Sequence, residues 1–443
     1  RPLTKIAAPR SMGLLAMVAL ACAVAALPAT EAGNPSCGTP VPASAPDPTS
    51  FNCSYNGVCR ASGCECFPGW QGEFCHQLDL LPATNGSGLN LLHNSSSPIS
   101  TWGGSVIFDN ATQLYHMYYS EITRHCGIHR WVTNSVVSHA TSRGPADGWK
   151  FTRVGQLFDL FTHEPIVARA PTGEFVLYVT HYPGDASDCP TCNCTDGDSS
   201  SGEPGCANEC GGGKNKTLFS YFTSSTSPYS GWSPLTSLCA TQMGGNKNCS
   251  TGGNAHIDMN LAPVIRPDGS VLAWTRWAIW QATDWRNAST YVNTGQAPDH
   301  NSHPPTPWEG EDPSTWVDRH GHYHILSHNG DRGHIYPNNQ SGDCGRHYFS
   351  EQGLAGTWRV APLPAADLGG CAWPRVNVPF TNGNNYTFYR RERPHLVFGP
   401  DGYTPVALTT AVIDSPTGPA VPGFVPPQRD ASYTLLQPVN TKQ

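Results

Sequence analysis

Four segments of the sequence carry a polar or charged residue nine positions before the glycine of a turn. Counting back from Gly173, Gly269, Gly321 and Gly402 gives, in this order, Glu164, Asn260, Asp312 and Arg393. A fifth segment has Gly103 at this position when its Asp109 is aligned with Asp318. Carboxylates can act as general acids or bases, and guanidinium and amide groups bind hydroxyls and carboxylates. If the fold brings these positions together, they form a site for acid–base chemistry on a polar ligand.

The elements that must position these residues are five similar strand–turn–strand segments. They span residues 105–119, 165–182, 263–277, 313–328 and 394–410. Asp-Gly and Thr-Gly pairs in their turns, between alternating apolar residues, favour β-hairpins. In three of the units, a segment that contains aromatic residues or histidine is followed by a Gly-Trp or Gly-Thr-Trp group. This second pattern indicates further strands, so that each unit would have four. We therefore predict an all-β fold, a five-bladed β-propeller, with a two-layer sandwich as the alternative.

A propeller would explain how residues far apart in the sequence come to share one site. The innermost strands of all blades begin around one mouth of the central channel, so the five aligned positions would converge there. Residues 433–436, Tyr-Thr-Leu-Leu, could supply a late strand that closes the ring.

Composition excludes several other classes of protein. Charged residues make up 13% of the 443 residues, and the chain has 45 glycines and 40 prolines. This composition is poor in strong helix formers and rich in turn residues, which excludes a helical bundle or coiled coil. A formal net charge of −7 provides no basic surface for nucleic acid, so we expect no nucleic-acid partner.

The first 32 residues predict export. Basic residues precede an uncharged apolar run over 11–30, which is typical of a secretory signal; an uncleaved anchor is the alternative. One of the 17 cysteines, Cys22, lies in this run, and an even number remains for disulfides. The chain also has ten Asn-X-Ser/Thr acceptors. These features predict a secreted or cell-surface glycoprotein.

Residues 33–76 form a compact cysteine-rich segment, which is too short to fold without disulfides. Its ending, Cys-Glu-Cys-Phe-Pro-Gly-Trp-Gln-Gly-Glu-Phe-Cys over 64–75, resembles an EGF-like module. The resemblance implies the pairs Cys37–Cys59, Cys53–Cys64 and Cys66–Cys75. It also implies a spacer or adhesive role, with an extracellular protein as a possible partner. Gly-Asn-Pro-Ser stands before the first cysteine instead of the acidic residues of the calcium-binding variant, so we expect no calcium there.

The predicted propeller, residues 77–443, contains a cysteine-rich insertion at 185–214. It holds five cysteines, and Cys-Pro-Thr-Cys-Asn-Cys within it fits either a zinc site or a disulfide knot, of which the knot suits an oxidising compartment. Because five is odd, at least one must pair outside the insertion. If Cys239 pairs with Cys249, the partner is one of Cys126, Cys344 and Cys371.

The whole region from about residue 98 to 440 resembles the five-bladed glycoside hydrolases of the arabinanase and β-xylosidase type. The phrases that carry the resemblance are Glu-Asp-Pro-Ser-Thr-Trp over 311–316 and Arg-Arg-Glu-Arg-Pro-His over 390–395. The resemblance implies Glu164 as general acid, Asp312 as general base and Asp258 as the carboxylate that tunes the acid, with Glu311 as another source of that third carboxylate. The residues it implies for sugar binding are Trp102, His163, Glu311, Arg391, Arg393 and His395.

The sequence leaves several interpretations of these residues open. The family places its base in the first blade, where this chain has Trp102-Gly103-Gly104. A carboxylate before proline could simply accept backbone N–H bonds. Glu392, between arginines, favours a structural ion pair. His322, His324 and His328 alternate along one strand and could bind a metal or lie at the surface or in the core.

The sequence thus predicts a carbohydrate-active protein of glycoside hydrolase type that acts on a glycan or polysaccharide and needs no cofactor or metal. The alternative is a non-catalytic adhesion or matrix glycoprotein that binds glycan or protein. A structural glycoprotein without a ligand is the third possibility.

Overall fold

The computed structural model describes residues 52–92, 98–182, 191–195, 219–238, 260–275, 278–296, 309–329, 344–354, 357–360, 371–374, 377–413 and 430–442. These residues form mainly β-strands, and the α-helix α1 (Trp131–Asn134) is a single turn. The predicted all-β fold is confirmed. The N-terminal 51 residues, including the predicted signal and Cys37, lie outside this description.

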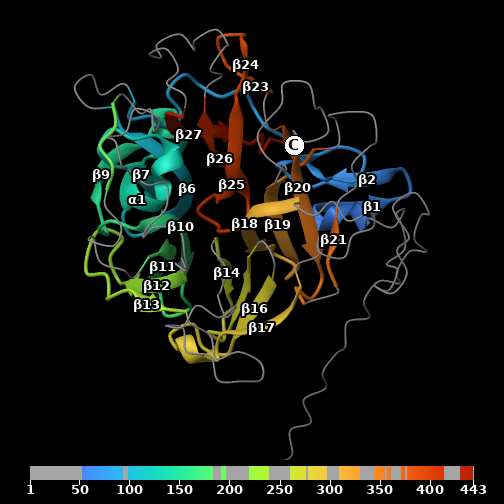
Figure 1. The fold of residues 1–443 in the computed structure, drawn as a ribbon. Coiled ribbons are helices and arrows are strands. Elements are labelled where there is room, and N and C mark those ends of the chain that lie inside the picture. The colour runs from blue at the N-terminus through green and yellow to red at the C-terminus, as the bar shows by residue number, and fades with distance from the viewer. Residues whose placement is uncertain are drawn as a thin grey trace, which may run out of the picture.

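Five antiparallel sheets follow one another along the chain and surround a common centre, as Figure 1 shows from cyan through green and yellow to red. The first comprises β6 (Ser100–Asp109), β7 (Leu114–Ile122), β8 (Ser135–Ser142) and β9 (Thr152–Gln156). The second comprises β10 (Thr162–Arg169), β11 (Phe175–His181), β12 (Phe219–Ser225) and β13 (Thr236–Ser237). The third comprises β14 (Ala262–Ile265), β15 (Val271–Trp274), β16 (Ala278–Ala282) and β17 (Val292–Gln296).

The fourth sheet comprises β18 (Glu309–Val317), β19 (Tyr323–Asn329), β20 (Cys344–Ser350) and β21 (Arg359–Val360), and β22 (Trp373–Pro374) pairs with β20. The fifth comprises β25 (Arg390–Phe398), β26 (Pro405–Ile413), β27 (Ser432–Pro438) and β5 (Gly88–Leu89). A separate hairpin pairs β23 (Asn377–Pro379) with β24 (Asn385–Thr387). The five-bladed propeller predicted from the repeats is confirmed, and the sandwich alternative is excluded.

The ring closes by pairing the two ends of the propeller. The late strand predicted at 433–436 lies within β27, which is the third strand of the last blade, and β5 from the start of the propeller forms the fourth. Ser87 Oγ donates to the carbonyl of Leu436 at 2.7 Å beside this pair. Gly88 is required here, because a β-carbon would lie 2.2 Å from the carbonyl oxygen of Thr434. Closure joins the sheet edges that an open ring would expose.

Apolar side chains fill the seams between neighbouring blades. Tyr118 and Val137 of the first blade pack with Leu177 and Val179 of the second. Alternation along each strand sends these residues into the seams, so each blade buries both faces and the core is divided among the seams.

The N-terminal segment is a small disulfide-bonded unit with two short strand pairs. The first pairs β1 (Gly57–Arg60) with β2 (Gly63–Cys66), and the second pairs β3 (Trp70–Gln71) with β4 (Gln77–Leu78). The bridges Cys53–Cys64 and Cys66–Cys75 are confirmed, with Cα separations of 5.6 and 5.3 Å. The third predicted pair involves Cys37, which lies outside the described residues.

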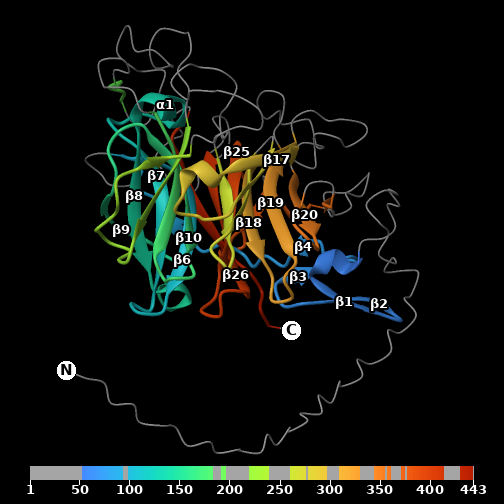
Figure 2. The ribbon, with the colours of Figure 1, turned by 90° about the horizontal axis from the view of Figure 1, so that it is seen from below.

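This N-terminal unit packs directly on the fourth blade (Figures 1 and 2). The Trp70 ring lies 5.0 Å from that of His347, and the Tyr55 ring stacks on His322 at 4.0 Å. Cys53, Cys75 and Trp70 belong to one buried apolar cluster with blade residues that include Leu326 and Leu408. The unit and the propeller therefore share a core.

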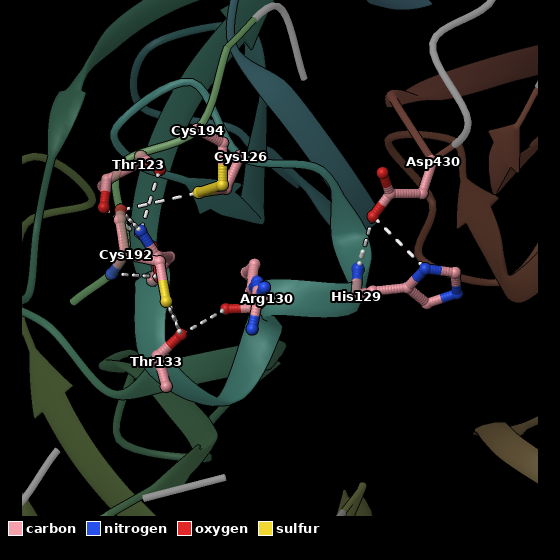
Figure 3. Close-up of a disulfide and its surroundings, with 9 residues drawn as sticks. Thr123, Cys126, His129, Arg130, Thr133, Cys192, Cys194 and Asp430 are labelled. Atoms are coloured by element: carbon pink, nitrogen blue, oxygen red, sulfur yellow. Dashed lines mark hydrogen bonds and ion pairs between the residues drawn. A yellow bond between two sulfur atoms is a disulfide. The ribbon is translucent and has the colours of Figure 1, made fainter. Parts of the chain in front are cut away.

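The insertion after β11 is anchored to the first blade by a disulfide between Cys126 and Cys194 (Figure 3). This confirms that an insertion cysteine pairs outside it, with Cys126 among the three partners considered. Cys192 is also disulfide-bonded, so these two sulfurs are not zinc ligands. Among the residues that the structure describes, no helix has the length and apolar character that crossing a membrane requires.

Candidate functional site at the channel mouth

The five aligned positions share an unusual backbone conformation. Each has a positive φ: Gly103 67°, Glu164 53°, Asn260 67°, Asp312 54° and Arg393 56°. In β6, β10, β18 and β25 the position coincides with a register shift against the neighbouring strand, which marks a β-bulge. Left-handed backbone costs a residue with a side chain about 1–2 kcal/mol. Strain repeated in four blades at equivalent places is typical of a functional site.

Hydroxyl groups of the preceding blade hold two of these positions. The Glu164 backbone N–H donates to Ser120 Oγ at 2.8 Å, and the Asn260 N–H donates to Thr180 Oγ1 at 3.4 Å. Ser120 lies in β7 and Thr180 in β11, the second strands of their blades. Both positions are thus anchored from the blade before them.

Arg393 joins the carboxylates of two other blades. Its Nη1 atom lies 2.7 Å from Glu164 Oε1 and 2.8 Å from Asp312 Oδ1. Asn260 Nδ2 donates to the same Asp312 oxygen at 2.6 Å. The Arg393 and Asp312 side chains are buried, with exposed fractions of 2% and 7%. Blades two to five therefore contribute to a single polar cluster.

The first blade contributes space to this cluster. A β-carbon on Gly103 would lie 3.2 Å from Arg393 Nε, so the arginine side chain lies directly against this glycine. Arg393 thus occupies the place where a first-blade side chain would stand. This packing accounts for the absence of a carboxylate at that position.

Two histidines lie beside the carboxylates of this cluster. His163 Nε2 lies 3.3 Å from Glu164 Oε1, and its Nδ1 lies 2.6 Å from Ser135 Oγ, while its ring stacks on Trp131 at 4.9 Å. His328 was considered only as a metal or core residue in the sequence. Its Nδ1 lies 3.1 Å from Asp312 Oδ2.

His328 is charged at neutral pH. Burial by itself would lower the pKa of His328, but the Asp312 and Glu392 carboxylates outweigh it and raise this pKa to about 9. Glu311, predicted to contact substrate or supply a third carboxylate, lies 3.5 Å from His328 Nε2. The imidazolium therefore bridges Asp312 and Glu311.

Three side chains, His328 among them, are also candidates for holding a metal ion. Asp312, His328 and Glu392 each offer a ligand atom, and these atoms lie within 4.8 Å of one another. Carboxylate and imidazole ligands suit several divalent ions. Binding of a metal would displace the proton that the raised pKa of His328 keeps on this ring at neutral pH.

The remaining predicted residues divide between this cluster and the protein interior. His395 is buried, and burial, followed by the charge of Arg393, lowers its pKa to about 3. Arg391 points elsewhere: its guanidinium donates to Thr410 Oγ1, the Pro374 carbonyl and Gln437 Oε1. The structure does not bring Arg391 into the cluster. Asp258 lies outside the described residues.

Trp102 is 3% exposed and packs in an apolar cluster with Ile122 and Ile128. The Arg390 guanidinium lies 5.2 Å from the centre of its ring. Arg390 also bonds Glu392 through two nitrogens at 2.8 and 2.6 Å, which agrees with the structural ion pair inferred for Glu392. Trp102 thus supports the edge of the mouth from within the protein.

The sequence indicated Asn260 as one of the positions of this site, but it did not indicate the contribution of His328. Asn260 was marked only by the spacing of the repeat. His328 gave no signal, because its approach to Asp312 depends on how the β18 bulge aligns this strand with β19.

No protein-family model matches the sequence, and no curated protein matches it. Solved structures do match. An α-L-arabinofuranosidase from Podospora anserina, in complex with cellotriose, has a TM-score of 0.49 at 11% identity over 82% of this chain and 98% of its own. A family 117 glycoside hydrolase from Zobellia galactanivorans has 0.44 at 12%, over 82% and 91%. An endo-arabinase from Bacteroides thetaiotaomicron has 0.41 at 13%, over 82% and 99%. At this similarity, residue roles have to be argued from the site itself.

Proposed function

We propose that the protein is a carbohydrate-active enzyme of glycoside hydrolase type that binds a glycan at the channel mouth. The observation that carries the proposal is the approach of Glu164 and Asp312, from two separate blades, to one shared guanidinium. Glycoside hydrolysis uses such a pair of carboxyl groups, one to protonate the leaving oxygen and one to activate water or attack the sugar.

The surroundings of the two carboxylates favour different roles. Three groups lie around the two oxygens of Asp312. Asn260 and Arg393 donate hydrogen bonds to Oδ1, and the charged ring of His328 lies beside Oδ2. Such an environment stabilises the anionic form, as a general base requires. Glu164 is less surrounded, with Arg393 and His163 beside one oxygen, and suits the general acid. Asp258 and Glu311 remain proposed as carboxylates that tune this acid.

Arg393 must move when a sugar enters. Because Glu164 and Asp312 approach the same nitrogen, their nearest oxygens can be no farther apart than the sum of 2.7 and 2.8 Å. An inverting pair needs ~6.5–9.5 Å between its carboxyls to admit water, whereas a retaining pair stands ~5–5.5 Å apart. We propose that sugar hydroxyls take over the Arg393 donors; the present spacing suits a retaining pair, and an inverting mechanism would require the bound ligand to separate the two carboxyls.

The setting of the site fits an extracellular glycan. Disulfides in both the N-terminal unit and the propeller are typical of an oxidising compartment. We propose that the protein is a secreted or cell-surface glycoprotein and that its N-terminal unit is an EGF-like module. The β1–β2 hairpin, where Val58 is 38% exposed, is the surface of this unit that we propose for an extracellular protein partner.

A release assay with matched variants tests the function. The wild type would be screened for reducing-sugar release from arabinan, xylan, cello-oligosaccharides and galactan. We expect Glu164→Gln and Asp312→Asn to lower release about 10²–10⁴-fold. The control variants Glu174→Gln and Asp401→Asn change carboxylates in hairpin turns, at the other ends of their blades, and should retain activity. Glycan binding without release by the wild type would instead support the non-catalytic alternative, and release that survives both site variants would contradict the assigned roles.

A further inference from the structure

A cavity opens close to the channel mouth, on the seam between the first and second blades. Its volume is about 530 Å³, within the ~300–1,000 Å³ of small-molecule sites. Phe161 in its wall directly precedes β10, whose third residue is Glu164. The other lining residues stand at the ends of β7, β9 and β11 and in β8, on the ring edge that also carries α1 in Figure 2.

A shared wall separates the cavity from the mouth. The Phe161 N–H donates to the carbonyl of Ser135 at 3.0 Å, and Ser135 Oγ lies 2.6 Å from His163 Nδ1. Val136, the next residue, lines the cavity. His163 approaches Glu164 on its other side. The cavity therefore lies one layer of residues away from Glu164, and a chain of linked sugars that begins in the mouth would reach it by passing over this wall.

The floor of the cavity is aromatic. Phe161 and Tyr182 meet edge to face at 5.8 Å and are both largely buried. Aromatic side chains provide apolar area for the C–H faces of sugar rings, and their low side-chain entropy makes them good contact residues.

The rim carries hydrogen-bonding groups of both kinds. Arg124 offers donors and Asp159 offers acceptors, whereas the Gln156 amide nitrogen already donates to the Phe158 carbonyl and to Asp159 Oδ1, so that the amide oxygen is the group that Gln156 can offer. Burial lowers the pKa of His181, so its ring is neutral at pH 7. Its Nδ1 lies 3.0 Å from the Phe161 carbonyl and must donate to it, which leaves Nε2 as an acceptor. Because the charges of Arg124 and Asp159 balance, this set fits a neutral ligand rich in hydroxyls better than an anion.

The loop that carries Arg124 is held in place covalently. Arg124 has a φ of 56°, and its carbonyl accepts from the Cys194 N–H at 3.0 Å. The Cys126–Cys194 disulfide and the Thr123 hydroxyl, which donates to the Asn134 carbonyl at 2.9 Å, fix both sides of this residue (Figure 3 shows the disulfide and Thr123). The cavity wall is thus a constrained structure, as a binding site requires.

We propose that this cavity is an accessory subsite that binds one or more further residues of a neutral oligosaccharide whose terminal or reacting sugar occupies the channel mouth. The proposal rests on the proposed function of the mouth. It adds that the preferred ligand is a chain of at least two sugars, and that affinity depends on chain length.

Calorimetric titration with arabino-, xylo-, cello- and galacto-oligosaccharides of one to six residues tests this proposal. For the series that binds best, the wild type should bind the tetrasaccharide about tenfold or more tightly than the monosaccharide. Arg124→Ala and Gln156→Ala should reduce this ratio several-fold. Both side chains lie at the rim, and a thermal melt checks that the variants are folded. Arg143→Ala is the matched control, since Arg143 is an exposed arginine at the other end of the first blade.

The outcomes distinguish the subsite from the function. If the wild type releases sugar but shows no length dependence, or if the rim variants leave the ratio unchanged, the subsite is excluded and the function of the mouth stands. If no oligosaccharide binds at all, both proposals fail. If the ratio falls in the rim variants as in the control, the effect is unspecific and the subsite is rejected.

Discussion

Arg393 of the fifth blade lies directly against Gly103 of the first: a β-carbon on this glycine would stand 3.2 Å from Arg393 Nε. This contact places the guanidinium where it reaches Glu164 and Asp312. The position of the Arg393 side chain in the mouth thus depends on the absence of a side chain at Gly103.

Substitution of Gly103 tests this relationship. Gly103→Ala adds a β-carbon at a φ of 67°, so we expect it to lower the free energy of unfolding by about 1–2 kcal/mol. Gly103→Asn should cost more, because its longer side chain would enter the place that Arg393 occupies, although asparagine tolerates this backbone region. Urea unfolding of both variants checks the order. Equal stability of Gly103→Ala and the wild type would contradict the close contact.

Removal of Arg393 should be more severe. Arg393→Met leaves the carboxylates of Glu164 and Asp312 without their shared cation, and breaking a buried pair in this way costs about 3–5 kcal/mol. Adding Asp312→Asn to Arg393→Met removes one of the unpaired charges and should restore part of the loss. A double-mutant cycle from urea unfolding measures this coupling. Additive losses would show that the two residues act independently.

The two buried histidine pairs should make the protein sensitive to acid. His116 and His139 lie 2.9 Å apart, and burial lowers their pKa values to about 4 and about 3. His324 and His347 form an equivalent pair at 3.0 Å in the fourth blade, where burial also lowers both pKa values.

Because the unfolded histidines titrate near pH 6.5, this stability is complete above that pH and is lost as the pH falls towards 4. The free energy of unfolding, measured in urea from pH 7.5 to 4, should fall accordingly. The slope should be smaller in His139→Gln. A pH-independent free energy over this range would contradict neutral buried pairs.

His328 should have the opposite effect on the alkaline side. Although burial opposes it, the neighbouring carboxylates raise the pKa of His328 to about 9. Its charged form therefore adds stability that is complete below pH 6.5 and is lost as the pH rises through about 9. We expect the free energy of unfolding to fall between pH 7 and 10, and His328→Gln to be less stable at pH 7 but flatter over this range. NMR titration of the His328 ring gives the pKa directly.

The N-terminal unit should unfold together with the propeller. Trp70 is 4% exposed and contacts both Trp316 and His347 of the fourth blade. Trp70→Ala should therefore lower the stability of the whole protein by about 3–5 kcal/mol. Val58→Ala, in the exposed β1 strand of the same unit, is the control and should change it little. Calorimetry should show one transition, whereas two separate transitions would mean that the unit folds independently.

Much of the architecture could be predicted from local patterns. Turn glycines and alternating apolar residues recur at each hairpin, and a strand of fixed length links each turn to the start of the innermost strand. This is why counting back nine residues reached Glu164, Asn260, Asp312 and Arg393, all of which have left-handed backbone in the structure. The disulfide parity argument succeeded for a similarly simple reason, since each cysteine has one partner.

The grouping of Arg391 with Arg393 shows where local patterns fail. The resemblance implied both arginines at the sugar site, and in a regular strand residues two apart do point to the same face. The bulge between Glu392 and His395 breaks this alternation. Arg393 turns into the mouth, while Arg391 bonds Thr410, Pro374 and Gln437 within the protein.

The sequence by itself determined the all-β class, the five repeated units and the positions that surround the channel, because each of these depends on short-range periodicity or turn chemistry. The pairs Cys53–Cys64 and Cys66–Cys75 were implied by the resemblance to an EGF-like module. Only the tertiary structure decided that Arg393 bridges Glu164 and Asp312, that His328 approaches Asp312, and that the cavity beside Phe161 adjoins the mouth. The Arg393 contacts join side chains from different blades and depend on how the blades close around the common axis, whereas the contact of His328 with Asp312 lies within the fourth blade and depends on the β18 bulge.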